Sequence, residues 1–144
     1  MTTVQQVFDA AMHLMDEQAE ATGATMTDDT NEYRYRTINI LNTIIPALFP
    51  FSDTYDVTTP IAGRPVVPQL TAADYANPDF TQIVPLDDTL AMGVLPYALG
   101  GHLAATENDD LSAWLMNRYN MAFADLRSRI PSSFEPISTP YGLF

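Results

Sequence analysis

The sequence contains no cysteine and no lysine. Without cysteine the chain has no disulfide, no thiol nucleophile and no thiolate ligand for zinc. Without lysine, the phosphate-binding lysine of a P-loop and Schiff-base chemistry are also excluded. The positive charge comes entirely from six arginines, which are Arg34, Arg36, Arg64, Arg118, Arg127 and Arg129.

Positive charge is therefore scarce, with 6 basic against 18 acidic side chains and a net charge of −12. Because proteins bind DNA largely through counterion release at Lys and Arg contacts, tight direct DNA binding is not expected. No apolar run approaches the roughly 18–20 residues of a membrane span. The N-terminal stretch MTTVQQVFDAAMH has no basic region typical of a signal peptide, so we expect a cytosolic protein at synthesis.

With 144 residues, 47% of them apolar, the chain is long enough for one hydrophobic core. Two helices are predicted in the first third of the sequence. Thr3 and Gln6 form a capping-box pattern for a helix that should stop at Gly23. A second helix should begin at Asp29 and end or kink at Pro46.

Two further helices are predicted in the second half. One begins after Pro85, with Asp87 or Asp88 as its cap, continues to about Thr106 and should kink at Pro96. The other begins at the acid-rich segment 108–110 and stops before Pro131. Its apolar stripe, which we expect to face the core with the tryptophan as the largest core side chain, is Leu111, Trp114, Leu115, Tyr119, Ala122, Leu126 and Ile130.

Two segments do not read as helix. The stretch 49–85 holds six prolines and predicts a long Pro-rich loop or a β-hairpin near 55–70. The stretch 131–144 holds three prolines and reads as an extended C-terminal arm. The predicted fold is therefore mainly α: a four-helix bundle domain over 1–130 with an insertion at about 49–85, followed by that arm. We expect both segments to serve assembly rather than the core of the single chain, the arm through the anchors Phe134, Ile137, Tyr141 and Phe144. The competing interpretation is that the arm packs on its own subunit.

Candidate catalytic residues are few. Asp9, His13 and Glu17 share one helical face and could hold a divalent metal, but ordinary solvated i,i+4 neighbours explain the same spacing. His102 has no carboxylate at metal-ligand spacing and is expected to be structural. The paired acids 28–29, 87–88 and 109–110 all fall at predicted helix starts, where capping explains them. We therefore predict a protein that is not an enzyme and has no cofactor and no metal site.

Small residues crowd the segment 93–105, with Gly100 and Gly101 at its centre. A glycine inside a helix costs about 1 kcal/mol relative to alanine, so another backbone should approach closely there. That backbone could belong to another helix of the same chain or to a neighbouring subunit. In the second case Gly100 and Gly101 would offer a groove to a neighbour's arm.

Several short segments, taken together, resemble a group of small proteins of tailed bacteriophages and prophages, the head-to-tail connectors or neck adaptors. They extend over most of the chain and are Leu-Met-Asp-Glu at 14–17, Leu41-Asn42, Phe-Pro-Phe-Ser-Asp at 49–53, Pro-Leu-Asp-Asp at 85–88, Leu-Pro-Tyr-Ala-Leu-Gly-Gly-His-Leu at 95–103, Glu107-Asn108 and Tyr141-Gly142. The resemblance implies a helical structural protein of the virion neck, assembled in the host cytoplasm. It implies a homo-oligomeric ring, commonly a dodecamer, between the portal protein and the tail or neck proteins, with DNA passing through its lumen without specific binding. It implies no catalysis, no cofactor and no membrane partner.

Two other functions fit the composition. One is an acidic inhibitor that mimics the charge of DNA, in which case the acids should form regular rows rather than gather at helix starts. The other is a small metal-dependent enzyme built on Asp9, His13 and Glu17.

Overall fold

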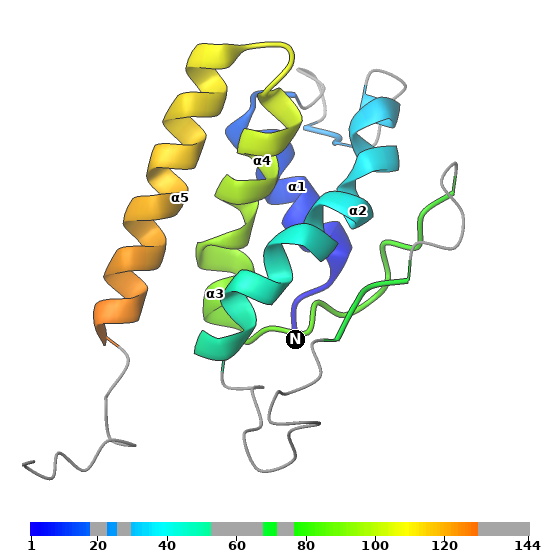
Figure 1. Cartoon of the computed structure of the whole chain (residues 1–144). Helices are drawn as coiled ribbons and strands as arrows, with labels where there is room; N and C mark the ends of the chain where they lie inside the picture. The colour runs from blue at the N-terminus through cyan, green and yellow to red at the C-terminus, as the bar shows by residue number, and fades with distance from the viewer. Residues whose placement is uncertain (18–22, 26–29, 53–67, 72–76, 130–144) are drawn as a thin grey trace, which may run out of the picture.

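The computed structural model describes residues 1–17, 23–25, 30–52, 68–71 and 77–129. This part of the chain is mainly helical, as predicted, and contains no strand, only an isolated antiparallel bridge between Thr3 and Ile83. Figure 1 shows α1, α2 and α4 side by side and α5 running along α4 at one edge of the molecule. The elements are α1 (Val4–Leu14), α2 (Asn31–Leu48), the 3-10 turn η2 (Phe49–Phe51), α3 (Asp88–Gly93), α4 (Leu95–Ala104) and α5 (Asp109–Arg129).

Helix α1 begins with the predicted capping box. The Thr3 hydroxyl accepts from the Gln6 N–H at 3.2 Å, and the Gln6 side chain accepts from the Thr3 N–H at 2.9 Å. Two more amides of the first turn, those of Val4 and Gln5, donate to the carbonyls of Gln82 and Phe80, each at 2.9 Å. The unpaired N–H groups of a helix start are thus satisfied partly by its own side chains and partly by a distant segment.

The predicted stop of this helix at Gly23 is wrong, because α1 ends at Leu14. Asp16 takes the left-handed conformation, with φ of 60°. The Glu17 N–H donates to the Met12 carbonyl at 2.8 Å and the Asp16 N–H to the His13 carbonyl at 3.2 Å. These two bonds make a Schellman ending in which aspartate stands where glycine is usual.

Helix α2 also departs from the prediction at both ends. Asp29 lies outside the described residues, and Thr30 precedes the helix with its hydroxyl donating to the Thr25 carbonyl at 2.7 Å instead of capping. At the other end the helix continues through Pro46 to Leu48, so of the two predicted outcomes, an end or a kink at this proline, the end is wrong. Pro46 is exposed, while Ile45 and Leu48 on either side are buried and hold the last turn in place.

The single kinked helix predicted after Pro85 consists of two helices. The Asp87 carboxylate accepts from the Leu90 N–H at 3.0 Å and caps α3, as one of the two predicted caps. The chain breaks at Val94, and Pro96 stands in the first turn of α4, where its missing N–H has no helical partner to lose. The proline therefore starts a helix instead of bending one.

Helix α5 begins as predicted, with the Asn108 side chain accepting from the Leu111 N–H at 3.0 Å. The expectation that its whole stripe enters the core is wrong. Leu115 is fully buried, but Trp114 is 50% exposed and is not a core residue. α5 packs against the rest of the chain along one side only. Leu115 lies on that side, and Trp114, the residue before it in the helix, is therefore left half exposed. Ile130, the last residue of the stripe, lies outside the described residues.

The described ends of the segment 49–85 belong to the core, which corrects the expectation that this segment serves assembly alone. The buried side chains there are Phe49, Leu70, Phe80 and Val84. The Asn42 side chain fixes the 68–71 stretch to α2, since it donates to the Leu70 carbonyl at 2.9 Å and accepts from the Leu70 N–H at 2.8 Å. Most of the predicted 55–70 hairpin lies outside the described residues.

Candidate functional site

Gly100 and Gly101 belong to α4 and are buried where this helix packs against α5 of the same chain. A Cβ atom on Gly100 would lie 3.2 Å from Cδ1 of Leu115, and one on Gly101 would lie 2.5 Å from Sδ of Met116. The Ser112 hydroxyl also donates to the Gly101 carbonyl at 2.7 Å. The close backbone approach predicted from these glycines exists, and α5 makes it. The role of Gly100 and Gly101 as contacts to a neighbouring subunit stays a prediction.

The four anchors predicted in the C-terminal arm, Phe134, Ile137, Tyr141 and Phe144, lie outside the described residues. Their role as contacts to a neighbour stays a prediction. The described segment nearest to the arm in sequence is the C-terminal half of α5. There Phe123 contacts Phe51 edge to face, with ring centroids 5.2 Å apart.

The Asp9, His13 and Glu17 face of α1 makes structural contacts. The Asp9 carboxylate accepts from the side chains of Gln5 and Thr25, and Glu17 lies 3.2 Å from the Tyr33 hydroxyl. Within the ranges that the structure describes, no group of three or more His, Cys, Asp or Glu side chains is placed to hold a metal ion. The geometry therefore gives the metal-enzyme alternative no support.

His102 also makes a local contact. Its Nδ1 lies 2.8 Å from the carbonyl of Ala98, one turn earlier in α4. This places the ring against the backbone of its own helix, which agrees with the structural role predicted for it.

Tyr33 joins three parts of the chain. Its hydroxyl donates to Glu107 at 2.7 Å, after the end of α4, and lies close to Glu17, after the end of α1. Burial raises the pKa of Tyr33, and the hydrogen bond to Glu107 raises it further. The hydroxyl therefore stays protonated and acts as a donor, which suits a structural link rather than a general base.

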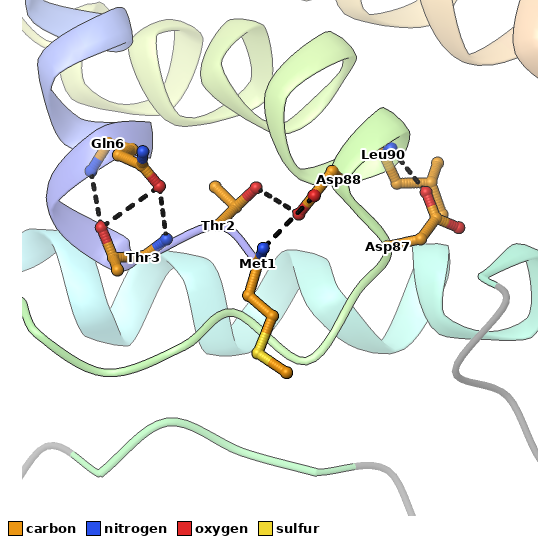
Figure 2. A network of polar contacts seen from close by, with 7 residues as sticks. All are labelled: Met1, Thr2, Thr3, Gln6, Asp87, Asp88 and Leu90. Carbon is orange, nitrogen blue, oxygen red and sulfur yellow. Dashed lines mark hydrogen bonds and ion pairs between the residues drawn. The ribbon is translucent and has the colours of Figure 1, made fainter.

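A second polar network ties the N-terminus to the start of α3 (Figure 2). The Thr2 hydroxyl donates to Asp88 at 2.8 Å, and the amino group of Met1 lies 3.4 Å from the same carboxylate. The Thr2 hydrogen bond lowers the pKa of the Asp88 carboxyl below its ordinary value. The paired acids at 87–88 thus have two different roles, since Asp87 caps a helix and Asp88 binds the N-terminal residues Met1 and Thr2.

The outer side of α5 exposes apolar surface. Trp114 is 50% exposed and Met121, two turns further along, is 56% exposed. Between them lies Arg118, whose Cζ is 5.8 Å from the centroid of the Trp114 ring and 5.9 Å from that of Tyr97 in α4. We call Tyr97, Trp114 and Arg118 the aromatic–arginine cluster. Arg118 makes no ion pair with a carboxylate in the described part of the chain.

A groove of about 410 Å³ lies beside this cluster, between α1 and the α3–α4 junction. Tyr97 belongs to both features and so joins them into one surface. Met92 at its edge is 44% exposed. We call this feature the α1–α4 groove; it is lined by Ala10, His13, Leu14, Met92, Gly93, Pro96 and Tyr97.

Neither the groove nor the cluster follows from sequence patterns. The groove joins α1 to the distant α3–α4 junction, and the cluster depends on how the consecutive helices α4 and α5 pack. The small residue Gly93 is the sequence signal for the groove, but the sequence alone groups it with Gly100 and Gly101 as a site of close backbone approach. A Cβ atom on Gly93 would have no atom within 4 Å, so this glycine faces open space in the groove.

Comparisons with protein-family models, with curated protein sequences and with solved structures found no match to this chain. None of the described helices is both long and apolar enough to cross a membrane. The α1–α4 groove and the aromatic–arginine cluster together form the candidate functional site, which combines an apolar groove with exposed aromatic and guanidinium groups.

Proposed function

We propose that this protein is a structural component of a tailed-bacteriophage virion, a head-to-tail connector of the neck. In this proposal it forms a homo-oligomeric ring between the portal protein and the tail or neck proteins, assembles in the host cytoplasm and lets DNA pass through its lumen. It is not an enzyme, and its partners are proteins.

The observation that carries the proposal is the exposed apolar surface of α5 and the groove beside it. Trp114, Met121 and Met92 are between 44% and 56% exposed in a chain with strong net negative charge. Trp114 and Met121 lie seven positions apart on one face of α5, and large exposed apolar side chains that share a face are typical of a protein interface rather than of a solvated face. The segment-by-segment resemblance to connector proteins supports the neck of the virion as the assembly that this interface would serve.

The charge of the chain suits this function. A ring whose protomers each carry −12 presents a surface that repels the DNA backbone. If acidic side chains line the lumen, DNA slides through it without being held. Regions rich in arginine would bind the phosphates and slow the passage of the strand.

The finer architecture belongs to the same proposal. We propose that α1, α2, α4 and α5 form the four-helix bundle of each protomer, with α3 as a short leading turn of α4. The segment at about 49–85 is an insertion whose ends pack in the core, and 131–144 is an extended arm.

The acidic inhibitor that mimics DNA is less well supported. Such a protein requires regularly spaced acids on its surface. Among the described residues, Asp87 caps α3, and Asp88, Asp109 and Asp110 lie in first helical turns, where the helix dipole accounts for them.

The proposal is tested by imaging the purified full chain by negative-stain electron microscopy, followed by antibody labelling of virions of the phage that encodes it. A closed ring with a central channel, and label at the junction of head and tail, are the expected results. A particle that is not a ring, or label on the capsid or tail fibres, contradicts the connector function.

A further inference from the structure

We propose that the α1–α4 groove and the aromatic–arginine cluster together bind the C-terminal arm, residues 131–144, of a second copy of this chain. The inference rests on the proposed function, because it names the contact between protomers of the ring. It assigns one surface of the protomer, one segment of its neighbour and one ion pair between them.

The groove fits an apolar side chain. Its volume of about 410 Å³ falls in the range of about 300–1,000 Å³ that is common for binding pockets. Leu14, Pro96 and Tyr97 line it with apolar surface. Gly93 has no side chain, so the space next to its Cα in the groove is empty. An aromatic or branched side chain entering it would remove its own surface and that of Met92 from water.

The cluster adds a site for a carboxylate. Arg118 lies over the rings of Trp114 and Tyr97, and these contacts hold the guanidinium in place through its flat face. The N–H groups at the edge of the guanidinium point away from such contacts and match the two oxygens of a carboxylate. Because no described carboxylate pairs with Arg118, the natural occupant is an acid on another segment.

The arm has the complementary chemistry. Its sequence PSSFEPISTPYGLF places Phe134 directly before Glu135, and Glu135 is its only charged side chain. Pro136 follows in the sequence, and proline favours an extended backbone, a form that aromatic-lined grooves bind with a low entropic cost. Phe134 or Ile137 in the groove would bring Glu135 beside the guanidinium of Arg118.

The arm of the same chain is poorly placed for this contact. Arg118 is eleven residues before the end of α5 at Arg129, which is about 16 Å along a helix at 1.5 Å per residue. Its guanidinium leans further back, over Trp114 one turn earlier. Only six residues separate Arg129 from Glu135, and reversing direction takes about four residues. A neighbour's arm has no such constraint.

The first test blocks the groove. Gly93→Leu fills the open space in the groove. Ala47→Leu is the matched control, because it adds an apolar side chain at an exposed position of α2 that lines neither the groove nor the aromatic–arginine cluster. Sedimentation of full-length chains should show self-association about tenfold weaker or more for Gly93→Leu, and unchanged for Ala47→Leu. Equal self-association of both variants and the wild type would overturn the inference, as would loss of thermal stability in a dilute monomer without a change in association.

The second test exchanges the charges. Arg118→Glu and Glu135→Arg should each weaken self-association, and the double variant should recover most of it because the ion pair is restored with reversed signs. Absence of recovery would overturn the assigned pair. If the wild type assembles and none of these variants changes it, the docking inference fails while the connector function stands. If the wild type stays monomeric at all concentrations, both fail.

Discussion

Helices α4 and α5 lie against each other, yet they bury very different shares of their residues. Eight of the ten residues of α4 are buried, whereas Leu115 is the one buried residue among positions 109–128 of α5. α4 contacts α1, α2 and α5 on different sides, while α5 contacts the rest of the chain on one side (Figure 1). The fold of one chain thus buries most of α4 and leaves most of α5 accessible, as the proposed contact of α5 with a second copy requires.

The residues explain this contrast. Ala98, Gly100 and Gly101 let neighbouring helices approach α4 closely from several sides. The outer side of α5 instead alternates large apolar residues such as Trp114 and Met121 with charged ones such as Arg118. Such a mixture suits an interface that must stay soluble before assembly.

The largest expected effect on stability comes from a substitution in the hydrophobic core. Phe8 is fully buried in α1 and packs against Phe80 with ring centroids 5.2 Å apart. Phe8→Ala should lower the free energy of unfolding by about 3–5 kcal/mol, because it removes an aromatic ring and leaves a cavity. Urea unfolding followed by circular dichroism measures this. A loss under about 1 kcal/mol would mean that the core around Phe8 is not tightly packed.

The contact between α4 and α5 should tolerate less extra side-chain volume than the open α1–α4 groove. A side chain at Gly101 meets Met116 at once, so Gly101→Leu should destabilise by about 1–3 kcal/mol. Gly93→Ala should be neutral or stabilise by up to about 1 kcal/mol, because it adds helix propensity in open space. The same unfolding measurement compares the two, and a reversed order would contradict the assignment of both glycines.

Substitution of Trp114 should separate stability from assembly. Because half of its surface is exposed, Trp114→Ala should change the free energy of unfolding of the dilute chain by less than about 1 kcal/mol. The same variant should weaken self-association, since an aromatic anchor of the interface is lost. Denaturant unfolding combined with light scattering checks both. A large loss of stability would mean that Trp114 is a core residue.

The smallest expected effect concerns the network at the N-terminus. The pKa of Asp88 is lowered in the folded chain, chiefly by the Thr2 hydroxyl, so its contribution to stability is present above the ordinary carboxyl pKa of about 4 and is lost as the pH falls below it. Asp88→Asn should remove this contribution and make the fall in Tm from pH 6 to pH 3 slightly shallower. An identical pH dependence in Thr2→Val and wild type would show that the hydrogen bond does not stabilise the fold.

Local signals in the sequence predicted local structure well. The capping box at Thr3 and Gln6, the cap at Asp87 and the start of α5 at Asn108 were predictable because each depends on residues three positions apart. The end of α1 at Leu14 was not, because Asp16 takes the left-handed conformation for which glycine is the usual residue.

Features decided by tertiary packing were the ones that the sequence left open or misplaced. Trp114 lies on an apolar stripe, but which edge of the stripe faces inward depends on where α4 lies. Gly100 and Gly101 predict a close helix, and the same pattern fits a helix of the same chain or of a neighbour. The groove needs α1 beside the α3–α4 junction, a contact between residues about eighty positions apart.

Trp114 is the only tryptophan of the chain, so its fluorescence reports directly on the proposed interface. Acrylamide quenching and the emission maximum can be followed from a dilute chain, whose mass is 15.9 kDa, to concentrations at which it assembles. The account predicts an accessible, red-shifted tryptophan in the monomer that becomes shielded and blue-shifted as the mass rises. A tryptophan that stays equally quenchable in the assembled protein would contradict the claim that a second copy covers this face of α5.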